Sequence, residues 1–360
     1  MPLAEEISSA RKLIYRDGYD MSFGEISTLY EKDELVINPE YQRLFRWEET
    51  QKTRFIESLL LNIPIPPIFV FTRPNGKWEL VDGLQRVSTL LQFLGILREE
   101  ASFVCDGTNL LPSLTGVRWP TKEEQDIDGA NLPVDVLSPA HQLTIKRSRV
   151  RVEILGPETD ATVKFELFQR LNTGGSNLSE QEIRNCIIFS LRPELLISLR
   201  NLSQDDNFTE MVPVGGVRES RQYLTELVLR ILVYRNFPYN SRLDVHEYLD
   251  KSSIAICENS AFDIDAELNV IRGAFDIIWQ AKESEAFEKN NRFSLAYYEF
   301  ICLGVSKYIN RGGDDVDFVR QRIDDIPNHP QIEQNTGAGV RGTQRLSNLI
   351  FASAEQFFQQ

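Results

Sequence analysis

Histidine is scarce in this sequence. The chain has 360 residues, of which 3 are histidines. They stand far apart in the sequence, at His141, His246 and His329. Zinc sites, His-based triads and His-metal nucleases therefore have almost no residues from which to be built. We therefore do not expect any of these three kinds of site in this chain.

Cysteine and long apolar runs are also in short supply. The 4 cysteines form no C-x-x-C pair, and the first residues, MPLAEEISSARKLIY, lack the apolar core of a signal peptide. The most apolar stretch, residues 59–71, is interrupted by prolines, so no segment reaches the roughly 18 unbroken apolar residues of a membrane span. We expect a cytoplasmic protein that does not enter the membrane.

Positively charged residues are also fewer than negatively charged ones. Lysine and arginine number 39 against 53 aspartate and glutamate residues, which gives a net charge of −14. Such a chain does not coat nucleic acid or anionic membranes by bulk attraction, so any phosphate site must be local. The 42% hydrophobic content is that of an ordinary globular protein, and at about 150 residues per domain the length predicts about two domains.

The first part of the chain, residues 1–155, shows mixed α/β patterns. Apolar spacing predicts a helix at 51–61 and a hairpin at 67–81, with Asn75-Gly76 as its turn. A second helix follows the five residues DGLQR at 82–86, and residues 100–140 read as a loop-rich insertion. Residues 144–155 alternate like a half-buried strand.

The second part, residues 156–360, reads as mostly α-helical. Helical spacing is clearest at 161–171, 180–191, 221–236 and 292–310, and Ser179 with Glu182 forms a capping-box pattern. We place the domain boundary near residue 156. The predicted fold class is therefore α+β: a first α/β domain followed by a helical one.

The first candidate site is the DGLQR corner between a strand and a helix. A glycine there lets the backbone approach a ligand, and an arginine offers two donors to a phosphate. Asp82 would hold Mg²⁺ or orient a water molecule. The alternative is an ordinary Asp-Gly turn followed by a surface arginine.

Two further segments combine residue types that bind nucleotides. Arg43 and Arg46 stand among aromatic residues in NPEYQRLFRW (38–47), which suits phosphate pairing and base stacking; the alternative is a loop whose aromatics fill the core. Backbone donors that close over a phosphate are expected from the loop NTGG, which consists of Asn172, Thr173, Gly174 and Gly175. The alternative for that loop is a helix C-terminus in left-handed conformations.

A basic stripe accompanies the strand predicted at 144–155. Arg147, Arg149 and Arg151 fall on one face, with Val150, Val152 and Ile154 on the other. The stripe is either a solvated strand face or one wall of a phosphate pocket.

Taken together, these segments resemble the N-terminal domain of the GmrSD family of modification-dependent restriction systems, whose core is similar to the nucleotide-binding fold of ParB and sulfiredoxin. The resemblance rests on INPEYQRLFRW (37–47), residues 51–71, ELVDGLQRVSTLLQF (79–93) and FELFQRLNTGGSNLSEQEIRN (165–185), and it covers about residues 20–235. It implies that the first domain, 1–155, binds a nucleoside triphosphate and that the helical domain completes the pocket and carries a partner interface.

The resemblance also implies roles for single residues. Asp82, Gln85 and Arg86 become catalytic candidates, with Mg²⁺ expected beside the nucleotide, while Arg43 and Arg46 become phosphate ligands. Gly83 and the NTGG loop would supply backbone donors. The resulting hypothesis is a prokaryotic defence protein that binds and hydrolyses a nucleoside triphosphate.

Three departures from the family's pattern limit these expectations. Leu84 replaces the central glutamine of the family's D-G-Q-Q-R motif, which puts hydrolysis in doubt more than binding. No cysteine stands at the corner, so sulfiredoxin-type redox repair is not expected. Full-length family members resemble fusions to a His-Asn-His nuclease, and this chain has no cluster of histidines, so we expect a separate effector protein, a nuclease or toxin-like protein, or a homo-oligomer.

Two other functions remain open. The protein is alternatively a non-catalytic adaptor that binds nucleotide or DNA. As a further alternative, the ParB-like domain itself cuts DNA with Asp82 and a metal ion, for which the arginine stripe at 147–151 would supply the basic surface.

Overall fold

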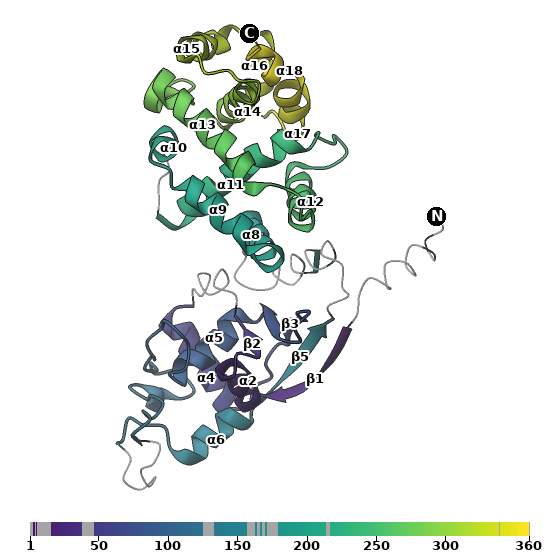
Figure 1. Cartoon of the computed structure of the whole chain (residues 1–360). Helices are drawn as coiled ribbons and strands as arrows, with labels where there is room; N and C mark the ends of the chain where they lie inside the picture. Colours follow the sequence, from purple (N-terminus) through teal and green to yellow (C-terminus); the bar gives the residue numbers. More distant parts are fainter. Residues whose placement is uncertain are drawn as a thin grey trace. The chain divides into compact units, whose positions relative to one another are not determined.

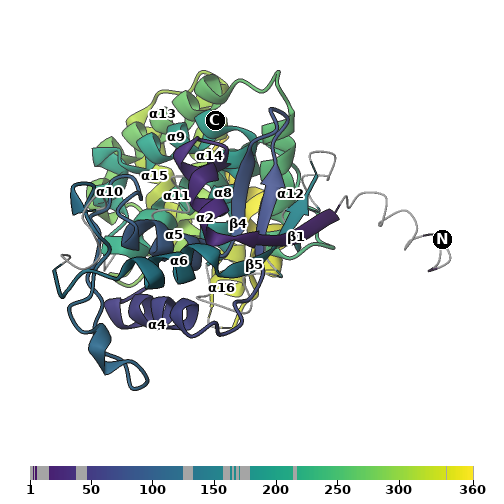
Figure 2. The ribbon, with the colours of Figure 1, turned by 90° about the horizontal axis from the view of Figure 1, so that it is seen from below.

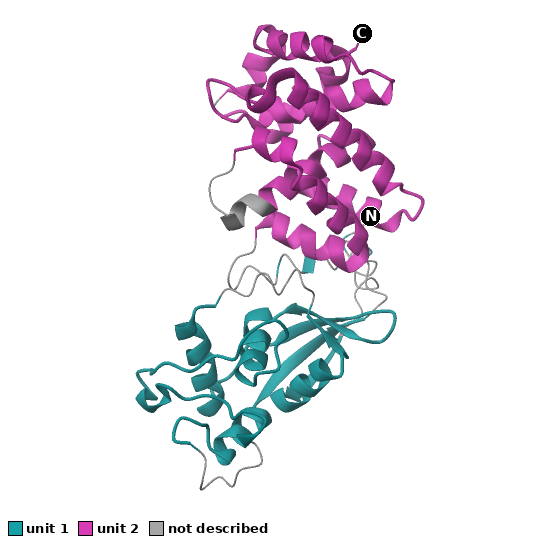
Figure 3. Ribbon diagram, turned by 60° about the vertical axis from the view of Figure 1, so that its left-hand side comes forward, with its two compact units in different colours: residues 1–177 teal, residues 178–360 magenta. Residues whose placement is uncertain are grey.

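The chain divides into two compact units, residues 1–177 and residues 178–360 (Figure 3). The computed structural model describes residues 16–37, 47–124, 133–156, 179–213, 217–337 and 339–359, together with residues 3, 5, 163, 166, 167 and 170. Unit 1 carries a β-sheet and unit 2 is helical (Figure 1), so the predicted α+β class is confirmed. The predicted boundary near residue 156 directly follows the last strand, whereas the division into units falls between Asn177 and Leu178.

The described part of unit 1 forms a mixed five-stranded sheet with the order β1-β5-β3-β4-β2. Its strands are Arg16–Ser22 (β1), Leu35–Val36 (β2), Ile68–Thr72 (β3), Trp78–Asp82 (β4) and Arg149–Leu155 (β5). β3 and β4 form the predicted antiparallel hairpin, and Gly76 in its turn has φ of 81°. β1 and β5 are antiparallel, whereas β5 pairs with β3 and β2 pairs with β4 in parallel.

In the described residues of unit 1, four α-helices accompany the sheet, and they lie on one side of its strands in both Figure 1 and Figure 2. They are Phe23–Glu31 (α2), Glu49–Leu60 (α4), Leu84–Phe93 (α5) and Pro139–Arg147 (α6). Each buries one apolar stripe: Phe23 and Ile26 of α2, Ile56 of α4 and Leu90 of α5 are all 0–1% exposed. A serine cap starts α2, because the Ser22 hydroxyl accepts from the Glu25 amide in a capping box.

The described residues between α5 and α6 are mostly loop, as the sequence predicts for 100–140, apart from the 3₁₀ turn Pro112–Leu114 (η1) and the start of α6. Two side chains of α4 hold this loop. The Thr53 hydroxyl accepts from the amide of Asp106 at 3.0 Å, and the Thr108 hydroxyl donates to Glu57. The far side of α4 is thereby fixed to the body of unit 1.

The strand predicted at 144–155 begins later in the structure, at Arg149. Ser138 caps a helix that has Pro139 at its first position, and this helix, α6, runs to Arg147. Arg147 therefore belongs to a helix, and only Arg149 and Arg151 lie on the exposed face of β5. Arg151 is paired with Glu153 at 3.3 Å and with Asp20 at 3.9 Å.

Unit 2 is helical throughout its described residues. Its α-helices are Glu180–Leu191 (α8), Pro193–Ser203 (α9), Asp206–Met211 (α10), Val217–Asn236 (α11), Val245–Glu258 (α12), Ile264–Lys282 (α13), Leu295–Asn310 (α14), Val316–Asp325 (α15), Pro330–Thr336 (α16), Gly342–Arg345 (α17) and Phe351–Phe357 (α18). Short 3₁₀ turns at Glu283–Glu285 (η4) and Ile326–Asn328 (η5) and a π-helical turn at Leu346–Ile350 (η6) connect some of them. None of the helices in the described residues is long and apolar enough to span a bilayer.

The predictions for unit 2 agree with these bounds where the structure describes them. The helices expected at 180–191, 221–236 and 292–310 are confirmed as α8, α11 and α14, and the Ser179–Glu182 capping box is present. The helix expected at 161–171 falls for most of its length outside the described residues.

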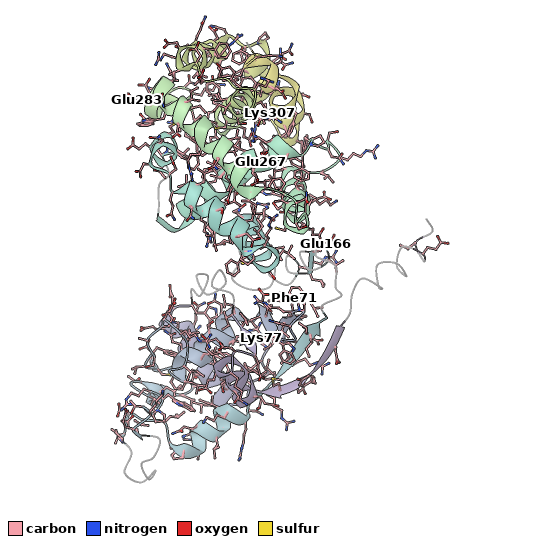
Figure 4. The ribbon with its side chains drawn as sticks, in the orientation of Figure 1. Phe71, Lys77, Glu166, Glu267, Glu283 and Lys307 are labelled. Atoms are coloured by element: carbon pink, nitrogen blue, oxygen red, sulfur yellow. The ribbon has the colours of Figure 1, made fainter. Side chains whose placement is uncertain are left out.

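Charged side chains are built into the core of unit 2. Glu299 of α14 is 0% exposed and accepts hydrogen bonds from Arg230 at 2.9 Å, Tyr234 at 3.0 Å and Arg345 at 2.7 Å. A second group joins Arg235 to Glu267 at 3.0 Å; Glu267 is labelled in Figure 4. Buried ion pairs of this kind fix helices in one arrangement only when all partners are present.

Candidate functional site

A cavity of about 610 Å³ opens on unit 1 between α4, the segment that follows it and the corner between β4 and α5. It is lined by Trp47, Gln51, Arg54, Phe55, Ser58, Pro64, Ile65, Pro66, Pro67, Phe69, Asp82 and Arg86. Its size is in the range of a small-molecule site. The charged residues among the lining are Arg54, Asp82 and Arg86, and the rest is apolar or neutral.

Helix α4 forms the polar wall of the cavity. Its N-terminus is fixed by a capping box, in which Gln51 accepts from the Glu48 amide at 3.1 Å. Gln51, Arg54 and Ser58 are spaced by three and four residues, so they share one side of the helix. The periodicity of the sequence places Arg54 on the solvent side of α4, but only the fold shows that this side lines a cavity.

The remaining lining, called here the apolar wall, is mostly apolar, and part of it is stiff. Pro64, Pro66 and Pro67 each fix the φ angle of their backbone, which restricts this segment to few conformations. Phe69 of β3 continues the wall, and the Trp47 indole packs against Phe55 with 5.8 Å between the ring centroids. The cavity therefore combines polar side chains of α4 with an apolar wall suited to a flat apolar group.

The corner at the floor of the cavity depends on Gly83. This residue has φ of 95°, which favours glycine, and it directly precedes α5. A Cβ atom at this position would lie 2.5 Å from Cγ2 of Ile68, so the close packing against β3 also demands glycine. Gly83 does not line the cavity. Its backbone conformation and its packing against Ile68 are sufficient reasons for a glycine at this position.

Asp82 and Arg86 form an ion pair across the corner. The Nη2 of Arg86 lies 3.0 Å from Oδ2 of Asp82, and its Nη1 donates to the carbonyls of Pro66 and Pro67, the latter at 3.0 Å. Burial raises the pKa of Asp82, while the charge of Arg86 and hydrogen bonds from Arg86 and the Gly83 backbone oppose that rise. Arg86 thus ties the corner to the proline segment.

Gln85 acts on the cavity through Trp47. Its Oε1 accepts from the backbone N–H of Trp47 at 3.1 Å, and Gln85 does not line the cavity itself. Because Trp47 directly follows Arg46, this hydrogen bond fixes the chain at the end of the segment that holds Arg43 and Arg46. Those two arginines and the loop Asn172, Thr173, Gly174 and Gly175 lie outside the described residues.

The remaining predicted basic residues do not reach this site. Arg147, Arg149 and Arg151 are exposed and are not among the residues that line the cavity. In the structure they form part of a solvated surface of α6 and β5, with Arg151 paired to Asp20 and Glu153. Arg54 also lines the cavity but could not be predicted from the sequence, because an exposed arginine on a helix belongs to no motif.

The described residues of the cavity do not form a site that would hold a metal ion by protein ligands alone. Within the described ranges, no group of three or more His, Cys, Asp or Glu side chains is arranged to hold an ion. Asp82 is the single carboxylate among the lining residues of the cavity. Mg²⁺ commonly takes one or two carboxylates together with substrate phosphates and water, so Asp82 would be its protein ligand.

The cysteine nearest in sequence to the corner has no reactive thiol. Cys105 is 2% exposed, and burial raises the pKa of its thiol to about 12. A thiol that stays protonated at neutral pH is a poor nucleophile. The local environment of Cys105 therefore gives no support to sulfiredoxin-type chemistry.

The sequence of this unit matches a known domain family. The family model described as "GmrSD restriction endonuclease, N-terminal domain" aligns with residues 26–189, which include every residue that lines the cavity. Residues 26–189 match the GmrSD N-terminal domain family. The resemblance inferred from the motifs is confirmed over this range, and the domain indicates a component of a restriction-type defence system. Comparisons with curated proteins and with solved structures gave no match.

Proposed function

We propose that the GmrSD N-terminal domain binds a nucleoside triphosphate with Mg²⁺ in this cavity and hydrolyses it, and that the protein acts with a separate effector in defence against foreign DNA. One observation carries the proposal. A single cavity brings together the Asp82–Arg86 corner, the cation of Arg54 and the aromatic face of Trp47. A nucleotide needs groups of these kinds: counter-charges for phosphates, a carboxylate for the ion or water, and a flat surface for the base.

Each residue has a separate role in the proposed hydrolysis. Phosphoryl transfer is catalysed mostly by positioning and by stabilising charge, so an arrangement of fixed donors is sufficient. Asp82 would orient the attacking water, and Gln85 would position Trp47 through its backbone N–H. Asp82 would also hold Mg²⁺ bound with the nucleotide, and the ion would neutralise phosphate charge.

The test is nucleotide hydrolysis by the purified protein, measured as phosphate release from ATP, GTP, CTP and UTP in the presence of Mg²⁺. Asp82→Asn keeps the size of the side chain and removes its charge, so we expect hydrolysis to fall by about 100-fold or more. Glu247→Gln, an exposed residue of α12, is the matched control and should hydrolyse at the wild-type rate. Equal rates for wild type and Asp82→Asn would refute the catalytic assignment.

A second candidate function is a nucleotide-binding adaptor without turnover. It is favoured by Leu84, which stands where the family's motif has a glutamine and so removes one polar contact from the first turn of α5. Calorimetry separates the two functions: an adaptor binds nucleotide tightly and releases no phosphate. Leu84→Gln should then restore hydrolysis if the missing amide is the cause.

A further inference from the structure

We propose that Arg54 is the residue that binds the phosphates of the ligand in this cavity. The inference rests on the proposed function, because it assumes that a nucleotide occupies the cavity, and it deepens it by naming the group that recognises the triphosphate. Arg54 is distinguished from the other charged lining residues by its lack of an ion-pair partner among the described residues.

The charge of Arg86 is already neutralised inside the protein. Its side chain is 13% exposed and is paired with Asp82, and its Nη1 is used by the carbonyls of Pro66 and Pro67. The Asp82–Arg86 pair is neutral as a unit, so it offers little net attraction to a triphosphate. An anion that enters the cavity therefore needs a second positive group.

Arg54 meets this requirement by position and by chemistry. It is exposed, it lines the cavity, and it stands between Gln51 and Ser58 on the polar side of α4. The guanidinium group matches two phosphate oxygens at once, and the side-chain amide of Gln51 adds a neutral donor, whereas the Ser58 hydroxyl donates to the Arg54 carbonyl. The three side chains together form a polar strip along one wall.

The backbone of α4 is rigid enough to hold that strip. Phe55, Ile56 and Leu59 anchor the helix in the core, and Thr53 and Glu57 tie its other side to the loop at 106–108. A guanidinium on a fixed helix loses less conformational freedom on binding than one on a loop. The strip is thus prearranged for an anion.

The apolar wall sets the direction of the ligand. Trp47, the prolines at 64, 66 and 67, and Phe69 offer a surface for a base or sugar, but no charge for a phosphate. A base placed against this wall leaves Arg54 to pair with the phosphates. The geometry therefore predicts that Arg54 distinguishes a nucleoside triphosphate from the nucleoside that lacks its phosphates.

The test measures the binding of ATP, GTP, CTP and UTP, and of the four matching nucleosides, by calorimetry. Arg54→Ala should weaken binding of the preferred triphosphate by about 10- to 100-fold and leave binding of its nucleoside within about 2-fold. Arg54→Lys keeps the charge without the planar fork and should fall between the two. Arg149→Ala, an exposed arginine of β5 outside the cavity, is the control and should bind like wild type.

Salt dependence gives an independent readout. Raising the ionic strength should weaken triphosphate binding by wild type more steeply than by Arg54→Ala, because a charge–charge contact is screened. Equal triphosphate affinity of wild type and Arg54→Ala would overturn this inference alone. A wild-type protein that binds none of the four triphosphates would overturn the proposed function together with it.

Discussion

The guanidinium of Arg86 lies 3.0 Å from the carboxylate of Asp82, across the corner where β4 turns into α5. The two charged residues of the DGLQR motif are therefore partners of each other. Arg86 also donates to the carbonyls of Pro66 and Pro67, so a single side chain connects the motif to the apolar wall of the cavity. A change at Arg86 should alter both the charge state of Asp82 and the position of that wall.

The pH profile of nucleotide hydrolysis should report the charge effect. The burial of Asp82 raises its pKa and Arg86 opposes that rise, so Arg86→Ala should raise this pKa further. Because the proposed hydrolysis requires ionised Asp82, the acid limb of the profile should move to higher pH. Arg86→Lys restores a cation and should move the limb back toward its wild-type position. An acid limb at the same pH in all three proteins would contradict a coupling between the two residues.

Gly83 should tolerate substitution poorly. An alanine there places a methyl group 2.5 Å from Cγ2 of Ile68 and also adopts φ of 95°, which strains the backbone. We expect the free energy of unfolding to fall by about 2–4 kcal/mol.

Gly76 is the matched control for that substitution. It also has a positive φ, of 81°, but no atom lies within 4 Å of the position of an added Cβ. Gly76→Ala should lower the free energy of unfolding by only about 1 kcal/mol, because it strains the backbone but introduces no steric clash. Denaturant unfolding of both variants checks the difference; equal costs would show that packing against Ile68 is unimportant.

Removing Glu299 should destabilise unit 2 strongly. Glu299→Ala leaves the donors of Arg230, Tyr234 and Arg345 without their shared acceptor in the core, and we expect a loss of about 3–5 kcal/mol. In contrast, Glu247 pairs with Lys251 on an exposed helix face, and Glu247→Ala should cost less than about 1 kcal/mol. Urea unfolding of the two variants tests this, and a similar cost for both would contradict the prediction.

The stability of unit 2 should depend on pH through Asp250. This carboxylate is buried beside Arg184, with Nε of Arg184 at 2.7 Å, and burial raises its pKa to about 6. The folded state therefore holds a proton that the unfolded state has lost above its ordinary value near 3.8. The stability that this proton contributes is full below that value and is lost as the pH rises through about 6.

Asp250→Asn provides the measurement for this effect. The variant cannot titrate at this position, so the difference between its free energy of unfolding and that of wild type should change by about 1 kcal/mol between pH 5 and pH 7. Over that interval wild type should lose stability relative to the variant. A difference that stays constant with pH would show that Asp250 does not titrate in this range.

Local sequence signals predicted much of the fold. The Asn75-Gly76 turn, the strand-to-helix corner at Gly83 and the capping box at Ser179 each depend on neighbouring residues, and the structure contains all three. The order of the sheet could not be predicted in this way, because β1 pairs with a strand far along the chain.

The errors have equally local causes. Arg147, Arg149 and Arg151 alternate like a strand, but Ser138 and Pro139 begin a helix that includes Arg147. For the site, the motif singled out Asp82 and Arg86, and the structure shows that both line one cavity. Arg54 escaped notice because a charged residue on the solvent side of a helix is common, and only tertiary packing shows what that side faces.

The pairing of β1 with β5 has a consequence for biosynthesis. Arg16 lies opposite Leu155 in the register of this pair, so β1 can pair only after β5, the last strand in sequence, has been synthesised. Contacts between residues so far apart in the sequence form slowly, since a long loop must close before they form. During translation β1 should therefore remain unpaired until β5 leaves the ribosome, and the emerging chain should depend on chaperones most strongly over this interval.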